Sequence, residues 1–147
     1  MYMNGIDWCA QVIKGPTPVY QEGHEYLGWA NYYGTRDALD EAFGWVNAID
    51  PTTGNVAWRY KTSSLPLGAV TATGGGLVIT GAIDGNLIVL DAATGAELHK
   101  ANLGGAIGGG IVTYEVANRQ FVAVAAGDNN FTYKTRGDNT IVVLGLP

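Results

Sequence analysis

The sequence is poor in charge and holds a single cysteine. Only 14% of its 147 residues are charged, and eight basic residues stand against thirteen acidic ones, for a net charge of −5. A chain without a basic excess has no electrostatic footprint for nucleic acid or for an anionic membrane. No apolar run approaches the roughly 18 residues of a transmembrane helix, and no signal peptide is visible at the N-terminus. Cys9 stands alone, which excludes an internal disulfide.

The sequence is rich instead in glycine, with 22 residues, and it contains an internal repeat. One copy reads GWVNAIDPTTGNVAW (44–58), and 41 residues later a second reads GNLIVLDAATGAELH (85–99). In each copy an apolar strand ends at an Asp, three turn residues follow, and a Gly precedes a second short strand. A hairpin repeated at this period is typical of a β-propeller blade.

The chemistry of the turn accounts for the residues that recur. Asp50 and Asp91 can accept hydrogen bonds from backbone amides two residues on, which starts a turn. The Gly four residues later supplies the positive φ that closes the turn. Trp58 then stands where a large ring can pack on the next blade, and His99 holds the same position in the second copy. These residues predict a fold rather than a chemistry.

From residue 44 onward the chain is rich in Val, Ile and Thr, as strands require. The expected strands are 1–9, 45–49, 55–60, 69–73, 77–81, 87–90, 97–101, 111–116, 120–125 and 140–144. They group into blade units at 44–62, 69–103 and 111–147. We therefore predict an all-β fold, a partial β-propeller of about two to three four-stranded antiparallel blades, forming a single domain over residues 1–147.

A propeller of two or three blades has open edges. Natural rings close with four to eight blades, and unpaired strand edges invite association. We therefore expect the missing blades to come from a partner chain, from self-association or from a longer parent chain.

Residues 10–43 differ from the rest of the chain. They contain Pro16, Pro18 and half of the tyrosines, and we expect a long excursion or loop. One helical turn is expected at 35–43, capped by Thr35 and with Asp37 in its first turn. A loop of this length in a compact fold usually has a function or packs on another part of the protein.

Four stretches, in this order, resemble the C-terminal part of the quinoprotein alcohol dehydrogenases, which use pyrroloquinoline quinone (PQQ). They are YMNGIDWC (2–9), the repeat at 44–58, TATGGGLVITG followed by DG (71–85), and VTYEV followed by QFVAVAAG (112–127). The resemblance implies an eight-bladed periplasmic propeller with PQQ on its axis. There a Ca²⁺ or lanthanide ion polarises the quinone, an Asp acts as the general base, and the cofactor oxidises a small alcohol.

The resemblance also implies which parts of that site lie in this chain. The family's metal ligands and catalytic Asp lie upstream of this segment, so we expect no catalytic and no metal-binding residue here. Asp7 matches a position, often Asn, near the cofactor. Leu67 and Phe131, which follows Asn130, stand where members of the family have Trp. The resemblance implies that Asp7, Leu67, Asn130 and Phe131 contact PQQ along an apolar rim.

A non-enzymatic interaction module is the alternative. Blades with PQQ-type repeats also occur in scaffold proteins that bind no cofactor, such as an outer-membrane assembly lipoprotein family. The aromatic residues of 10–43 would then form an interface. The dehydrogenase interpretation requires Asp7, Leu67 and Phe131 to converge, whereas the scaffold interpretation does not.

Overall fold

The computed structural model describes residues 1–13, 16–24, 26, 33–129 and 133–145. These residues form strands, turns and loops, and none of them is helical. The strands are β1 (Tyr2–Asp7), β2 (Ala10–Val12), β3 (Tyr33–Arg36), β4 (Phe43–Ile49), β5 (Val56–Thr62), β6 (Thr71–Ala72), β7 (Leu77–Gly81), β8 (Asn86–Asp91), β9 (Glu97–Asn102), β10 (Ile111–Val116), β11 (Arg119–Ala126) and β12 (Thr140–Gly145). Within the described part of the chain there is accordingly no helix that could cross a membrane.

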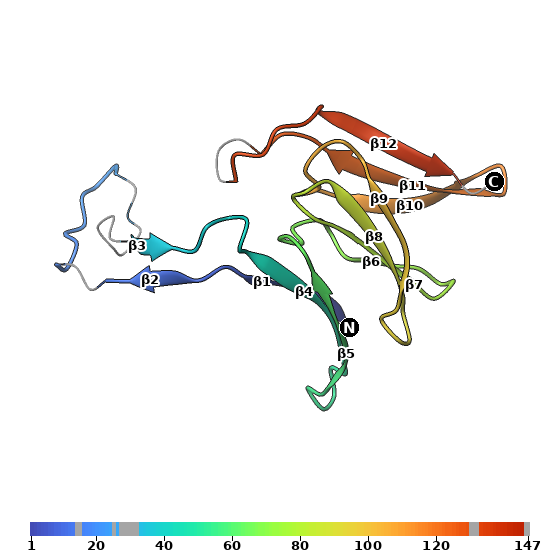
Figure 1. Cartoon of the computed structure of the whole chain (residues 1–147), viewed down its shortest axis with the longest axis horizontal. Coiled ribbons are helices and arrows are strands. Elements are labelled where there is room, and N and C mark those ends of the chain that lie inside the picture. The colour runs from blue at the N-terminus through green and yellow to red at the C-terminus, as the bar shows by residue number, and fades with distance from the viewer. Residues whose placement is uncertain (14–15, 25, 27–32, 130–132, 146–147) are drawn as a thin grey trace.

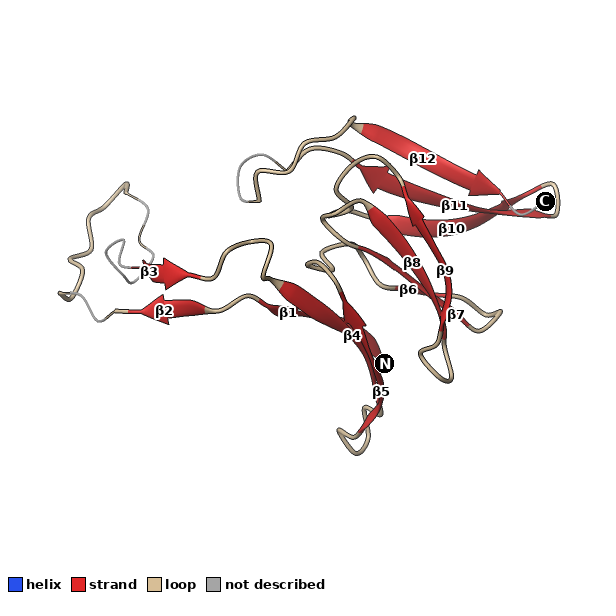
Figure 2. Ribbon diagram, viewed as in Figure 1, coloured by secondary structure: helices blue, strands red, loops and turns tan. Residues whose placement is uncertain are grey.

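Three antiparallel sheets follow one another along the chain (Figure 1, Figure 2). Blade 1 has the strand order β1-β4-β5, blade 2 the order β6-β7-β8-β9, and blade 3 the order β10-β11-β12. The edge strands β6 and β10 are neighbours, because the Thr71 hydroxyl donates to the Ile111 carbonyl at 2.6 Å. The prediction of an all-β partial propeller is confirmed.

Blades 1 and 2 are structural copies as well as sequence copies. β4 and β5 pair Ala48 with Trp58, and the register shifts directly after Ala48. β8 and β9 pair Val89 with His99, and the register shifts directly after Val89. Because the irregularity falls at the same place in both hairpins, each residue of blade 1 has a defined counterpart in blade 2.

The turn between β4 and β5 forms as its sequence predicts. The Thr52 amide donates to Asp50 Oδ1 at 2.9 Å, and the Gly54 amide donates to the Asp50 carbonyl at 2.8 Å. Gly54 has a φ of 74°, the left-handed region that glycine enters without steric cost. The same bonds form around Asp91, where the Ala93 amide donates to Oδ1 at 3.0 Å and the Gly95 amide donates to the Asp91 carbonyl at 2.8 Å.

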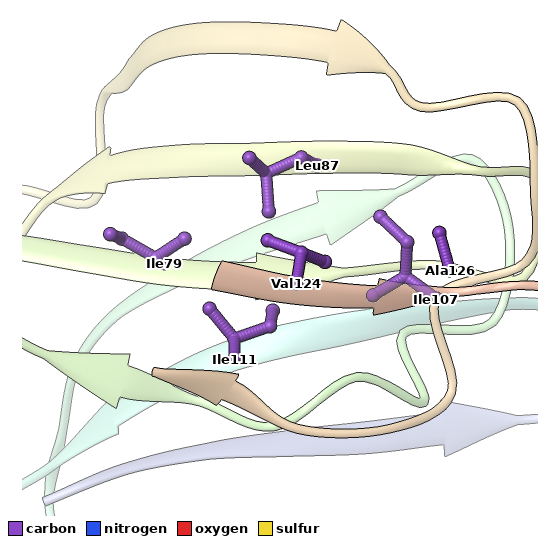
Figure 3. Close-up of a cluster of buried hydrophobic side chains, with 6 residues drawn as sticks. All are labelled: Ile79, Leu87, Ile107, Ile111, Val124 and Ala126. Carbon is purple, nitrogen blue, oxygen red and sulfur yellow. The ribbon is translucent and has the colours of Figure 1, made fainter. Parts of the chain in front are cut away.

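Apolar side chains fill the spaces between adjacent blades. Between blades 1 and 2 the buried members are Val46, Val78, Ile88 and Leu90, with the rings of Tyr2, Trp58 and Tyr60 packed against them. Between blades 2 and 3 the buried members are Ile79, Leu87, Ile107, Ile111, Val124 and Ala126 (Figure 3). Full burial of one such aliphatic side chain stabilises a fold by about 1.5–3 kcal/mol, so packing between blades holds the sheets together.

The structure corrects the expectation of a helical turn at 35–43. Residues Tyr33–Arg36 form β3, which pairs with β2, and the Asp37 amide donates to the Cys9 carbonyl at 3.0 Å. Thr35 therefore lies inside a strand and caps no helix. Pairing with a segment more than 20 residues earlier in the chain outweighs the local capping pattern. Figure 1 shows this small ladder projecting away from the three blades.

Blade 1 also includes residues from before the excursion. β1 pairs with β4 over its whole length, from Tyr2 opposite Ala48 to Asp7 opposite Phe43. Blade 1 therefore contains β1 as well as the hairpin at 44–62, and the excursion connects the two.

Candidate cofactor rim

Every second connection between the strands of the blades lies at one face of the molecule, which we call the loop face. Its described segments are residues 8–9, 37–42, 63–70, 82–85, 103–110, 127–129 and 133–139. Neighbouring segments are joined by three backbone hydrogen bonds of 3.0 Å, from the amides of Ile83, Ile107 and Gly127 to the carbonyls of Leu65, Ala82 and Ala106. The loop face is thus a connected surface to which all three blades contribute.

An apolar cluster lies at the loop face. Its buried members are Ala42, Leu65, Ile83 and Ala106, and Trp8, Leu39, Leu67 and Tyr133 pack against them. The Trp8 and Tyr133 rings have centroids 5.7 Å apart, and the Arg36 guanidinium lies 5.3 Å from the Trp8 ring. The indole nitrogen of Trp8 donates to the Asp37 carbonyl at 2.9 Å. The base of the projecting ladder is therefore fixed to the blades.

Two of the four predicted rim residues lie in the described part of the chain. Leu67 is half-buried in the loop-face cluster. Asp7 ends β1, and the thiol of Cys9 lies 3.9 Å from its Oδ1. Asn130 and Phe131 lie outside the described residues, so the convergence of Phe131 with Asp7 and Leu67 stays a prediction, as do the contacts of all four residues with the cofactor.

The described neighbours of the predicted residues do converge. Trp8 follows Asp7, Tyr133 lies two positions after Phe131, and both rings share one cluster with Leu67. Sequence analysis did not single out Trp8 or Tyr133 as site residues. The signal for Trp8 was present, since it belongs to the YMNGIDWC stretch.

A pocket of about 500 Å³ lies beside this cluster, and we call it the rim pocket. Its lining comes from Ala106, Gly108, Gly109, Ala125, Ala126, Gly127, Asp128, Asn129, Asn139, Thr140 and Ile141. A Cβ added at Gly108 would lie 3.7 Å from the Asn129 side-chain nitrogen and 4.0 Å from Leu67 Cβ. The pocket therefore adjoins Leu67 and the residue that precedes Asn130.

Hydrogen bonds fix the polar wall of the rim pocket. The Asp128 amide donates to Asn139 Oδ1 at 2.8 Å, and the Gly137 amide donates to Asp128 Oδ1 at 2.6 Å. Next to it is a hollow of about 320 Å³, lined in part by Asp84, Thr135 and Arg136. The Thr135 hydroxyl is buried and has no hydrogen-bond partner among the described residues. These groups offer donors and one fixed positive charge on the same face.

Within the described ranges there is no group of three or more His, Cys, Asp or Glu side chains that could hold a metal ion. The residues of the loop face can bind and orient a ligand. They offer an apolar wall, backbone and amide donors, and a guanidinium.

Known proteins match this chain in sequence over most of its length. Residues 42–142 match the family model described as outer membrane protein assembly factor BamB. Quinoprotein alcohol dehydrogenase PedE of Pseudomonas putida is 39% identical over 109 residues, which are 74% of this chain and 17% of that protein. The chain spans between 14% and 19% of the length of such curated relatives.

Solved structures agree with the sequence comparison. The quinohemoprotein alcohol dehydrogenase of Comamonas testosteroni superposes with a TM-score of 0.63 at 29% identity, over 80% of this chain and 19% of that one. A europium-containing methanol dehydrogenase superposes with a TM-score of 0.70 over 99% of this chain and 30% of that one. At 20% identity, the second match bears on the fold alone.

The blades and their loop face define a β-propeller of the quinoprotein type. The chain belongs to the family of PQQ-dependent, or quinoprotein, alcohol dehydrogenases.

Proposed function

We propose that this chain supplies propeller blades and one side of the cofactor rim in a PQQ-dependent alcohol dehydrogenase, without supplying a catalytic group. The observation that carries the proposal is the loop-face cluster, in which Leu67, Trp8 and Tyr133 pack on one buried core beside the rim pocket. Asp7, Leu67, Asn130 and Phe131 are the proposed cofactor contacts. A cluster that gathers residues from blade 1, the 63–70 segment and the 127–139 segment suits a ligand near the propeller axis.

The described residues fit one edge of PQQ. PQQ is a flat fused-ring quinone that carries carboxylates, and it supplies two-electron oxidation chemistry when bound. Leu67 offers an apolar wall, Gly108 allows close approach, and Asn129 offers a side-chain amide. Arg136 stands at the adjoining hollow, where a guanidinium can pair with a carboxylate. These residues would bind and orient the cofactor and keep water from one of its faces.

Completion of the ring is part of the proposal. The remaining blades, the Ca²⁺ or lanthanide ion and the catalytic base would come from a partner chain, from further copies or from a longer parent chain. A small alcohol is the proposed substrate, and the periplasm is the proposed location, as the family resemblance implies.

A titration with PQQ tests this role. We expect saturable binding in the micromolar range, measured by calorimetry and cofactor absorbance with and without Ca²⁺. Replacing the apolar wall by a carboxylate in Leu67→Asp should weaken binding about tenfold, because a charge of like sign faces the cofactor's carboxylates. Leu98→Asp is the matched control, since Leu98 is 55% exposed on β9. Absence of saturable binding, or equal loss in both variants, would contradict the proposal.

Activity of the chain alone tests the second half of the proposal. With PQQ and Ca²⁺ added, we expect the purified chain to show no alcohol-dependent reduction of a dye, because the described residues hold no metal cluster. Turnover above the rate of free PQQ would show that the catalytic machinery is present after all.

A scaffold role is the second candidate. The match to the model described as outer membrane protein assembly factor BamB favours it, as does the exposure of Val19 (82%) and Tyr20 (66%) beyond the ladder. The PQQ titration separates the two candidates, because a scaffold needs no cofactor. A chain that binds no PQQ but loses partner binding in Tyr20→Ser would support the scaffold.

A further inference from the structure

Aromatic rings fill the space between blades 1 and 2. The Tyr2 hydroxyl and the Trp58 indole nitrogen both donate to the Ala92 carbonyl of blade 2, at 2.9 and 3.0 Å. The indole also lies flat against Gly95, where an added Cβ would fall 2.6 Å from its Cδ2. Tyr60 packs against the same buried cluster and donates to the Glu97 carboxylate. Three rings therefore close this space.

Blades 1 and 2 share one strand register, so each of the three rings of blade 1 has a counterpart in blade 2 that faces blade 3. By their cross-strand partners, the counterparts of Tyr2, Trp58 and Tyr60 are Ile79, His99 and Ala101. Blade 2 thus has a branched aliphatic side chain, an imidazole and a methyl group where blade 1 has three rings. His99 is exposed, in contrast to the expectation that it packs between blades.

A cavity of about 370 Å³ lies between blades 2 and 3, and Ile79 and His99 are among its lining residues. Its lining residues are Thr73, Leu77, Ile79, Leu87, Val89, His99, Gln120, Val122, Leu144 and Gly145. Ile79 and Leu87 belong to the aliphatic cluster drawn in Figure 3, and Val89 and Val122 pack against it. No Trp, Tyr or Phe among the described residues lines the cavity.

The lining determines the kind of molecule that fits. Most of the wall is aliphatic, and the polar groups at it are the His99 imidazole, the Gln120 amide and the Thr73 hydroxyl. The volume falls within the range of small-molecule sites, and an apolar cavity of about 150 Å³ is known to stay dry and bind benzene. In the equivalent space on the other side of blade 2, the occupant is an indole with its N–H on a carbonyl.

We propose that the cavity between blades 2 and 3 is a binding site for a small planar aromatic molecule of the indole class, with its ring against Ile79, Leu87 and Val89 and its polar edge toward His99 and Gln120. The site is built from strands and one turn, and it shares no lining residue with the rim pocket.

Calorimetric titration of the whole chain with indole tests the site. We expect saturable binding with a dissociation constant on the order of 0.1–1 mM, as small ring ligands give. His99→Trp should weaken binding at least about tenfold, because the new side chain occupies the cavity. It should also raise the midpoint of thermal unfolding in the absence of indole.

A second pair of variants guards against a misfolded His99→Trp protein. Leu144→Trp fills the cavity from blade 3 and should also abolish indole binding, whereas Val143→Trp adds the same ring at the neighbouring, 50% exposed position and should leave binding intact. Failure of the unmodified chain to bind indole would overturn the proposal. Equal binding of indole by the Leu144→Trp and Val143→Trp variants would overturn it as well. So would a loss of binding that occurs only in those variants that sedimentation shows to self-associate.

Discussion

At the scale of single residues, the contact between Trp58 and Gly95 joins two blades. The indole lies where any side chain at position 95 would stand, and Gly95 has a φ of 74°. Gly54 is its counterpart in the first turn and has the same φ, but an added Cβ there would meet nothing within 4 Å. The two glycines therefore separate the cost of backbone conformation from the cost of a lost contact.

This pair gives a matched prediction. Gly54→Ala should lower the free energy of unfolding by about 1–2 kcal/mol, the cost of a left-handed conformation at a residue with a Cβ. Gly95→Ala should lower it by about 1–3 kcal/mol more, because the methyl group displaces the indole. Urea denaturation measures both values. Equal losses would mean that the indole does not dock on this turn in solution.

The turn aspartates give a prediction about pH. Hydrogen bonds from the Thr94 side chain and amide, with a smaller one from the Ala93 amide, hold the pKa of Asp91 below its ordinary value of 3.8. A carboxyl with a depressed pKa stabilises the fold above its unfolded pKa, and this stability is lost as the pH falls through the folded pKa. Asp91→Asn should therefore be less stable than the unmodified chain at pH 6, and the difference should shrink below pH 3.8.

Urea denaturation across this pH range measures the difference. Glu115→Gln serves as the control, since Glu115 is an exposed carboxylate on β10. A constant difference between Asp91→Asn and the unmodified chain at every pH would contradict the proposed linkage.

Residues in turns could be predicted because their conformations depend on neighbours in sequence. Asp50 and Gly54 behave as their turn pattern requires. The rim residues are different, because Leu67, Trp8 and Tyr133 share one cluster only after three blades have assembled. Their convergence follows from long-range packing, which a motif does not encode, and the family resemblance was the only guide to it.

At the scale of elements, the hairpin of β10 and β11 turns on two residues, of which the first is unsuited to it. Ala117 and Asn118 both have positive φ, 51° and 59°, and Val116 pairs with Arg119 directly across the turn. This geometry is a two-residue turn of the type that favours Asn-Gly. The predicted position of the hairpin is confirmed, although alanine is a poor residue at its first turn position.

Optimising this turn should stabilise blade 3. The double substitution Ala117→Asn and Asn118→Gly should raise the free energy of unfolding by about 1–2 kcal/mol, because Asn and Gly adopt positive φ more readily than Ala and Asn. Chemical denaturation measures the change. No gain, or a loss, would mean that the hairpin adopts another turn in solution.

Most strands were predictable from apolar alternation, because they lie within local hairpins. The strand β1 was expected as well, although its partner β4 lies beyond the excursion. The strands β2 and β3 were not expected, because their pairing over a long distance in sequence outweighed the capping pattern at Thr35.

At the scale of the whole molecule, open strand edges are the main feature. β12 is an edge strand of blade 3, with Ile141 68% and Val143 50% exposed. An apolar edge of this kind is a template for pairing with another chain. We therefore expect concentration-dependent association, seen by sedimentation velocity.

A charge on this edge should oppose association. Val143→Lys should move the sedimentation profile toward the mass of one chain, because a lysine on an edge strand resists pairing. Val19→Lys places the same charge on an 82% exposed residue outside the blades and should leave the profile unchanged. Equal effects of both variants would point to net charge rather than to the edge.

The excursion also governs the order in which the blades form. β7 and β8 close over residues 82–85, whereas β1 and β4 must close over residues 8–42, a connection roughly nine times longer. The entropy of closing a chain rises by about 0.6 kcal/mol for each doubling of length, which makes β1–β4 pairing costlier by about 2 kcal/mol. Blade 2 should therefore fold first and acquire slow hydrogen exchange early. Blade 1 should then assemble on it as a finished template, with Trp58 docking last.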